Sequence, residues 1–318
     1  MSTSKKLLEG ARIILFKLGA CKKNDTVCII SDYKTKDLGK LFDQLLEKNQ
    51  ISSKHFTIKS LKMHGIEPPQ FVAKYMKKST LILGLTQFSM AHTKAREKAT
   101  IEGARYLSLP DFNKNLLIHP ALKSDYFKIG KNSKILSKKL SKGKMIKIST
   151  KSGTDISFNI DKRISNFAPG YVDKKNLLGS PPDIEVNICP IEDSANGILV
   201  IDGSIPFPGF GKLNSKIKLY LVNGKISSID AIPSYKLKLS RLFASYGDKA
   251  KILAEFGIGL NPNAKLCGNM LIDEGTYGTF HFGFGSNSTI GGKNKINFHL
   301  DFVMFAKNFE LDKKLIKI

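Results

Sequence analysis

Two histidines and a carboxylate stand close together near the C-terminal end of the sequence. His281 lies in Gly-Thr-Phe-His-Phe-Gly-Phe-Gly, and His299 and Asp301 are two residues apart in Phe-His-Leu-Asp. Because side chains alternate across a β-strand, His299 and Asp301 share one face if this segment is a strand. Two imidazoles and a carboxylate that converge from paired strands form the outline of a divalent-metal site. The glycines around them leave room for an ion or a substrate.

Two glutamates occupy similar surroundings earlier in the chain. Glu185 lies in Pro-Pro-Asp-Ile-Glu-Val-Asn-Ile, and Glu255 lies in Ala-Glu-Phe-Gly-Ile-Gly. In apolar and glycine-rich runs an unpaired charge is costly, which favours ligand roles over ordinary surface carboxylates. Three carboxylates and two imidazoles can hold two divalent ions, with one carboxylate bridging them. The competing interpretation is that the histidines are satisfied core residues and the glutamates are solvated.

Composition limits the class of protein. The chain has 318 residues, of which 42% are hydrophobic, so two domains are expected. Its net charge of +24 comes mostly from lysines spread along the whole chain, densest between Lys114 and Lys151, without an arginine cluster or aromatic residues interleaved in the way that stacks bases. We therefore expect no specific nucleic-acid partner and no membrane partner. Four cysteines without C-x-x-C spacing, and no apolar signal core or membrane span, favour a cytoplasmic location.

The first part of the chain, residues 1–140, alternates helical and strand patterns. Thr26–Ser31 is a continuous apolar run, typical of a strand buried on both faces, and Lys36–Lys48 has leucines along one helical stripe. This rhythm predicts an α/β domain with a mainly parallel sheet. Ligands of such sheets lie beyond the carboxyl ends of the strands, so the loop around His92, after the strand at residues 80–85, is expected to face a cleft. His92 could instead cap the helix that begins near Thr93.

The remainder, residues 141–318, has a β-rich pattern. Residues 145–160 read as a hairpin, and Asn223-Gly224 between two alternating runs is a strong hairpin signal. One helix, at about residues 236–246, interrupts the strands. We expect a β-rich α+β domain that carries the metal site.

Taken together, the motifs resemble the thermophilic metallo-aminopeptidases of the aminopeptidase T and aminopeptidase S type. The resemblance covers nearly the whole chain and places the metal ligands at Glu185, Glu255, His281, His299 and Asp301. It implies hydrolysis of N-terminal residues from small peptides through two divalent ions (Zn, Co, Mn or Mg). It also implies a homodimer. From the chemistry of such a site we expect Glu255 to have a bridging or base-like role. Paired ions of this kind polarise the scissile carbonyl and activate a bridging water.

Two departures from the aminopeptidase pattern keep other functions open. Those enzymes have a tyrosine shortly after the Gly-Thr-x-His histidine, where this chain has Ser286-Asn-Ser288, and their two histidines are further apart. The chain also resembles the 2,5-dihydroxypyridine ring-cleaving dioxygenases at His281, His299 and Asp301. That resemblance implies a mononuclear Fe(II) site of two histidines and one carboxylate, with His92 as an acid-base residue near the substrate. A third possibility is a binding protein on the same fold without turnover.

Overall fold

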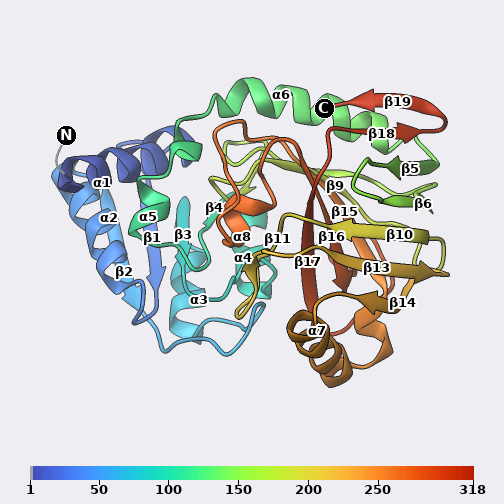
Figure 1. The fold of residues 1–318 in the computed structure, drawn as a ribbon. Helices are drawn as coiled ribbons and strands as arrows, with labels where there is room; N and C mark the ends of the chain where they lie inside the picture. The colour runs from blue at the N-terminus through green and yellow to red at the C-terminus, as the bar shows by residue number, and fades with distance from the viewer. Residues whose placement is uncertain (1–2) are drawn as a thin grey trace. The chain divides into compact units, whose positions relative to one another are not determined.

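The computed structural model describes residues 3–318, which fold into two compact units (Figure 1). The first unit takes the chain up to Tyr126 together with Ala168–Pro182, and the second takes Phe127–Phe167 and Asp183–Ile318. The ranges expected from the sequence, 1–140 and 141–318, were single segments, whereas each unit combines two segments of chain.

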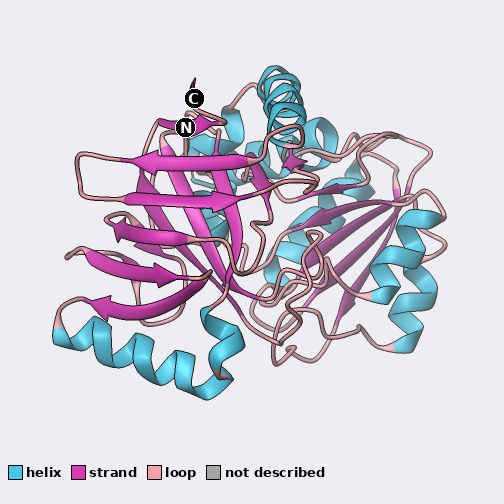
Figure 2. Ribbon diagram, turned by 90° about the vertical axis from the view of Figure 1, so that its right-hand side faces the viewer, coloured by secondary structure: helices cyan, strands magenta, loops and turns pink. Residues whose placement is uncertain are grey.

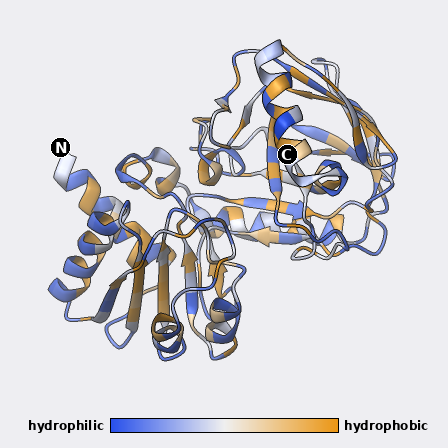
Figure 3. Ribbon diagram, turned by 90° about the horizontal axis from the view of Figure 1, so that it is seen from below, coloured by the Kyte–Doolittle hydropathy of each residue, from blue (hydrophilic) through white to orange (hydrophobic). Residues whose placement is uncertain are grey.

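The first unit is built on a five-stranded parallel sheet with the order β2-β1-β3-β4-β8. Its strands β1 and β3 are buried and largely hydrophobic, because helices pack on the sheet, and Figure 3 shows orange strands in this unit. The strands are β1 (Thr26–Ser31), β2 (Ser52–Thr57), β3 (Leu81–Leu85), β4 (Arg105–Ser108) and β8 (Leu178–Gly179).

The helices of this unit are short, apart from α1 and α2. Cys28 and Ile30 of β1 face α3 and α4, while α2 packs on the same strand and also contacts α1. A buried ion pair between Arg105 and Asp25 lies beside the start of β1. The helices are α1 (Thr3–Arg12), a π-helical stretch (Ile13–Leu18), α2 (Lys36–Lys48), α3 (Gln70–Met76), α4 (Lys94–Ile101), α5 (Lys114–Leu117) and a 3₁₀ turn (Pro120–Lys123).

The second unit contains two seven-stranded sheets, and strands dominate it in Figure 2. One sheet has the order β14-β13-β10-β6-β5-β18-β19, and the other β12-β11-β17-β16-β15-β9-β7. The first sheet comprises β5 (Met145–Ser149), β6 (Asp155–Asn159), β10 (Asn196–Ile201), β13 (Ile217–Val222), β14 (Lys225–Asp230), β18 (Asn308–Leu311) and β19 (Lys314–Lys317). The second comprises β7 (Asn166–Ala168), β9 (Glu185–Ile188), β11 (Ser204–Ile205), β12 (Gly211–Lys212), β15 (Leu253–Gly259), β16 (Thr279–Gly285) and β17 (His299–Phe305).

The core of the second unit is rich in aromatic side chains. Phe256 of β15 packs against Phe280 and Phe282 of β16 and against Phe158 of the other sheet. Three helices and one 3₁₀ turn accompany the sheets: α6 (Tyr126–Leu140), α7 (Pro233–Tyr246), the turn Asp248–Lys251 and α8 (Met270–Asp273).

The predicted fold class, an α/β unit with a parallel sheet and a β-rich unit, is confirmed. The β13–β14 hairpin turns at Asn223 and Gly224, both with positive φ, as an Asn-Gly turn of this kind requires. Within residues 3–318, no helix is long and apolar enough to cross a membrane.

Candidate metal centre

Four neighbouring strands of the second unit present one polar face. Antiparallel pairing sets Gly283 of β16 opposite both Glu255 of β15 and Asp301 of β17, and sets Gly257 opposite His281. β9 completes the row, with its first residue, Glu185, opposite Gly259 of β15. The strand register therefore gathers side chains that are more than a hundred residues apart in the sequence.

Strand alternation explains why this face is polar. In β16 the residues Phe280, Phe282 and Phe284 belong to the hydrophobic core, so His281 and Gly283 must point to the opposite side of the sheet. The same period places His299 and Asp301 of β17 on one face, as predicted. Burial of the phenylalanines thus fixes which way the polar residues point.

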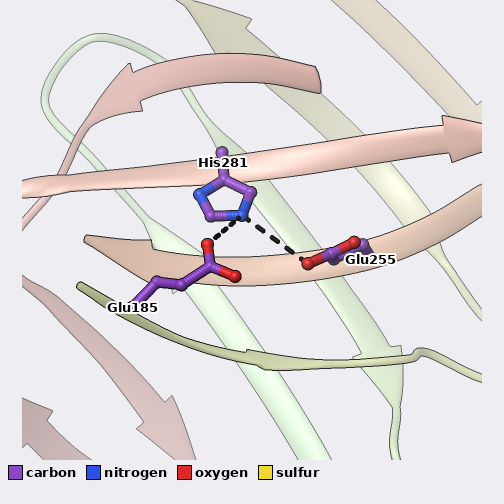
Figure 4. Close-up of side chains that lie close together, drawn as sticks. All are labelled: Glu185, Glu255 and His281. Atoms are coloured by element: carbon purple, nitrogen blue, oxygen red, sulfur yellow. Dashed lines mark ion pairs between the residues drawn. The ribbon is translucent and has the colours of Figure 1, made fainter. Parts of the chain in front are cut away.

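A first group of ligand atoms consists of Glu185, Glu255 and His281. Nε2 of His281 lies 3.2 Å from Oε2 of Glu185 and 3.7 Å from Oε1 of Glu255. Figure 4 shows the imidazole with the two carboxylates directed toward its Nε2 edge. All three residues are buried, and one ligand atom from each lies within 4.8 Å of the others. This spacing is compatible with one cation between them.

A second group shares Glu255 and adds the pair from β17. Nε2 of His299 lies 3.4 Å from Oε2 of Glu255 and 3.1 Å from Oδ1 of Asp301. Nδ1 of His299 donates to the carbonyl oxygen of Ser286 at 2.9 Å, and Nε2 of the same ring faces the carboxylates. Metal-bound histidines commonly donate their other ring N–H in this way. The five residues predicted as ligands are therefore brought together, with Glu255 between the two histidines.

Two glycines create the space for the imidazoles. A Cβ at position 257 would lie 1.9 Å from Nε2 of His281, and one at position 283 would lie 2.4 Å from Nε2 of His299. No side chain larger than hydrogen fits at either position without displacing a histidine. The glycines noted in the sequence thus have a specific structural role.

Glu185 is held by a short chain of amides. Nδ2 of Asn187 donates to Oε1 of Glu185 at 2.8 Å, and Nδ2 of Asn166 donates to Oδ1 of Asn187 at 3.3 Å. Oε2 of Glu185 is buried and accepts no hydrogen bond among the described residues. One oxygen is therefore fixed while the other is left facing His281, as expected of a carboxylate that binds a cation.

The electrostatics of the cluster are strongly coupled. Burial alone would lower the pKa of His281, but Glu185 and Glu255 outweigh it and hold this pKa well above the usual range. Burial would also lower the pKa of His299, but the nearby carboxylates, chiefly Asp301, hold it well above its usual range. Burial would raise the pKa of Glu255, yet the two histidines lower it. Because nearby positive charge stabilises the carboxylates, a divalent cation would compete for this site with the protons on His281 and His299.

Two further acids lie near this cluster. Burial, followed by repulsion from Glu185, raises the pKa of Asp183, and burial followed by repulsion from Asp301 raises that of Glu274. Oδ1 of Asp183 and Oε1 of Glu274 have no hydrogen-bond partner in the described part of the chain. The sequence analysis did not single out Asp183, although it stands two residues before Glu185 in the same apolar run.

His92 does not belong to either group. It lies in the first unit, in the turn between β3 and α4. Thr93 caps α4, since its side chain accepts a hydrogen bond from the backbone N–H of Arg96 at 3.2 Å. The structure thus assigns the cap to Thr93, and a catalytic role of His92 stays a prediction.

Comparison with known proteins identifies the family. A family model described as 2,5-dihydroxypyridine 5,6-dioxygenase (NicX) matches residues 16–317. The chain belongs to the NicX family. A curated relative, the 2,5-dihydroxypyridine 5,6-dioxygenase of Pseudomonas putida, is 26% identical over 189 residues, which are 56% of this chain and 53% of the relative. The aligned region thus spans about half the length of that relative.

Two solved structures share the fold of this NicX-family chain. The 2,5-dihydroxypyridine dioxygenase from Pseudomonas putida aligns with a TM-score of 0.81 and 18% identity, covering 100% of this chain and 96% of the other. AmpT from Thermus thermophilus aligns with a TM-score of 0.70 and 13% identity, covering 100% and 98%. At these identities the likeness establishes the fold alone.

The family match corrects the predicted activity. We expected a metallo-aminopeptidase, a hydrolase of peptides, and this prediction was wrong because the chain belongs to a dioxygenase family. The ligand types that suggested a peptidase are equally compatible with iron, so they could not decide between the two. The serines at 286 and 288, in place of a tyrosine, were the better signal.

Proposed function

We propose that this protein is a non-haem Fe(II) dioxygenase that opens a dihydroxypyridine ring or a closely related ring. The family match over residues 16–317 is the observation that carries the proposal. By analogy with the family's name, the bond between ring carbons 5 and 6 breaks, and both atoms of one O₂ enter the product. The metal cluster supports this proposal because its two groups, which share Glu255, together supply the imidazole nitrogens and carboxylate oxygens that such a site uses.

His281, His299 and Asp301 would hold the iron as two nitrogen ligands and one oxygen ligand, next to Glu255. A ferrous ion with two histidines and one carboxylate keeps open positions at which O₂ and a hydroxylated ring can bind. The donor atoms fit such an ion, since Nε2 of His281 and Nε2 of His299 both face Glu255, at 3.7 and 3.4 Å, and Oδ1 of Asp301 lies 3.1 Å from Nε2 of His299.

The chain's own groups have separable tasks in this proposal. Glu255 lies 3.4 to 3.7 Å from both histidine Nε2 atoms, so it keeps the two imidazoles in place. Asn187 fixes the orientation of Glu185 through a hydrogen bond of 2.8 Å. His92 of the first unit is proposed as an acid-base residue for the substrate.

Iron loading and oxygen consumption test the proposal directly. The protein is prepared without metal, loaded with Fe(II) under anaerobic conditions, and mixed with 2,5-dihydroxypyridine in air-saturated buffer. We expect one iron per chain, one O₂ consumed per ring opened, and loss of the ring's ultraviolet absorbance. Asp301→Asn serves as the inactive control. An iron-loaded protein that consumes no O₂ with any dihydroxypyridine isomer would refute the proposed activity.

A further inference from the structure

Helix α6 of the second unit buries Leu140 but leaves part of its aliphatic surface uncovered. Gly130, Ser133 and Ser137 are buried, whereas Ile135 is 57% exposed and Ile129 is only partly covered. Surface helices of globular proteins normally bury their aliphatic face. Here the small residues allow close packing on the unit, and Ser137 donates to the carbonyl oxygen of Ser165 at 2.9 Å. The aliphatic stripe is thus left for another occupant.

This stripe forms one wall of a groove. Leu260, Tyr277 and Ile316 lie across from it, where α6 runs beside the C-terminal strand β19 (Figure 1). The groove encloses about 430 Å³. Small-molecule sites typically have about 300–1,000 Å³ and mostly apolar linings with a few polar groups. Size and lining therefore fit a compact apolar ligand better than an extended protein surface.

The lysines that line the groove favour a ligand with a negative charge. The charged side chains that line the groove are Lys139 and Lys317, and no aspartate or glutamate of residues 3–318 lines it. Ile318 also lines it, and its main-chain oxygen accepts a hydrogen bond from Tyr277 at 2.7 Å. Helix α6 itself has five lysines and no aspartate or glutamate. Two copies of this face would bring like charges together, which disfavours self-association through it. An anionic headgroup beside an aliphatic body is complementary to the groove.

We infer that the α6–β19 groove is a binding site for a monomeric aliphatic carboxylate, such as a medium- or long-chain fatty acid. The ligand's chain lies along Ile129, Ile135 and Ile316, and its carboxylate pairs with Lys139. This site consists of residues that take no part in the proposed metal chemistry. It would give the protein a second ligand, unrelated to the ring substrate.

A chain-length series measured by calorimetry tests this inference. Carboxylates of six to fourteen carbons are titrated below their critical micelle concentrations, with the matching alcohols as uncharged probes. Each added methylene should tighten binding about fourfold until the groove is filled. The carboxylates should bind more tightly than the alcohols, and added salt should reduce that difference.

Substitutions on α6 locate the site. Ile135→Gln should weaken binding about tenfold because it places an amide on the apolar wall, and the exposed position preserves the fold. Lys139→Gln should weaken the carboxylates and leave the alcohols unchanged. Lys131→Gln, an equal charge change on the same helix outside the groove, is the matched control.

Several outcomes would overturn the inference. One is absence of binding by any carboxylate in the series, and another is equal weakening by Lys131→Gln and Lys139→Gln. A concentration-dependent dimer that Ile135→Gln abolishes would assign the groove to a second copy of the chain. Binding to anionic vesicles without binding of the monomeric carboxylates would assign it to a membrane surface.

Discussion

Gly257 tests whether the structure places His281 correctly for metal binding. A Cβ at this position would lie 1.9 Å from Nε2 of His281, whereas ordinary contacts begin at 3.4 Å, so Gly257→Ala must move the imidazole by about 3.4 − 1.9 = 1.5 Å. Metal–ligand distances tolerate only about 0.2 Å. We therefore expect Fe(II) affinity to fall by more than the roughly 100-fold upper range seen when a ligand's supporting partner is removed.

The measurement is an anaerobic titration of Fe(II) against a competing chelator, with thermal unfolding recorded in parallel. Gly143→Ala is the control, since its methyl would meet only the flexible end of Leu311, at 2.3 Å. It should lower stability slightly and leave iron affinity unchanged. Both variants should remain folded, because the methyl at 257 enters the polar face of the sheet and not the aromatic core.

A double variant separates the imidazole from the backbone. If the methyl acts only by displacing His281, then Gly257→Ala combined with His281→Ala should bind iron no more weakly than His281→Ala alone. Wild-type iron affinity in Gly257→Ala would refute the reasoning, because it would mean that His281 is not a ligand in this position. Additional weakening in the double variant would show that the strands themselves have moved.

Three further predictions follow from the same structure. Glu255→Gln should keep one iron per chain, measured by metal analysis, and lower turnover about 10–100-fold, whereas complete loss of iron would make Glu255 a ligand. His92→Ala should lower kcat with unchanged iron content and melting temperature, and wild-type kinetics would contradict a catalytic role. For Asp25, burial opposes ionisation, but hydrogen bonds from Thr80 and Arg105 prevail and lower its pKa below the ordinary 3.8. The ionised Asp25 therefore stabilises the folded state above pH 3.8, and this stabilisation is lost as the pH falls through the lower pKa of Asp25 in the folded protein. Asp25→Asn should lower the free energy of unfolding by about 3 kcal/mol at pH 7, measured with denaturant. It should also make the loss of stability at acid pH less steep.

Local sequence patterns were sufficient for the features that depend on neighbours in the chain. The alternation of Phe280, Phe282 and Phe284 with His281 and Gly283 determines which face of β16 is polar, and the two-residue spacing of His299 and Asp301 places both on one face of β17. Such patterns act through strand geometry alone, so they can be read without knowing the partner strands.

Features set by distant pairing could not be read in this way. The return of Ala168–Pro182 to the first unit, where it adds β8 to the sheet, has no local signature beyond a two-residue strand. Asp183 lies just before β9 and was passed over, since only the packed structure shows that its carboxyl is buried near the other acids. In α6, a helical pattern does not reveal that the small residues, and not Ile135, face the unit.

The error in function has a different physical origin. Glu185, Glu255, His281, His299 and Asp301 form a donor set of three carboxylates and two imidazoles that suits two hydrolytic ions or one ferrous ion beside two free carboxylates. The structure does not decide between one ion and two, because the two candidate ligand groups share Glu255 and each contains one histidine and two carboxylates. Ligand identity sets which ions can bind, while the reaction depends on what else reaches the open positions. Activity therefore has to be tested at the substrate, with the number of bound ions measured independently.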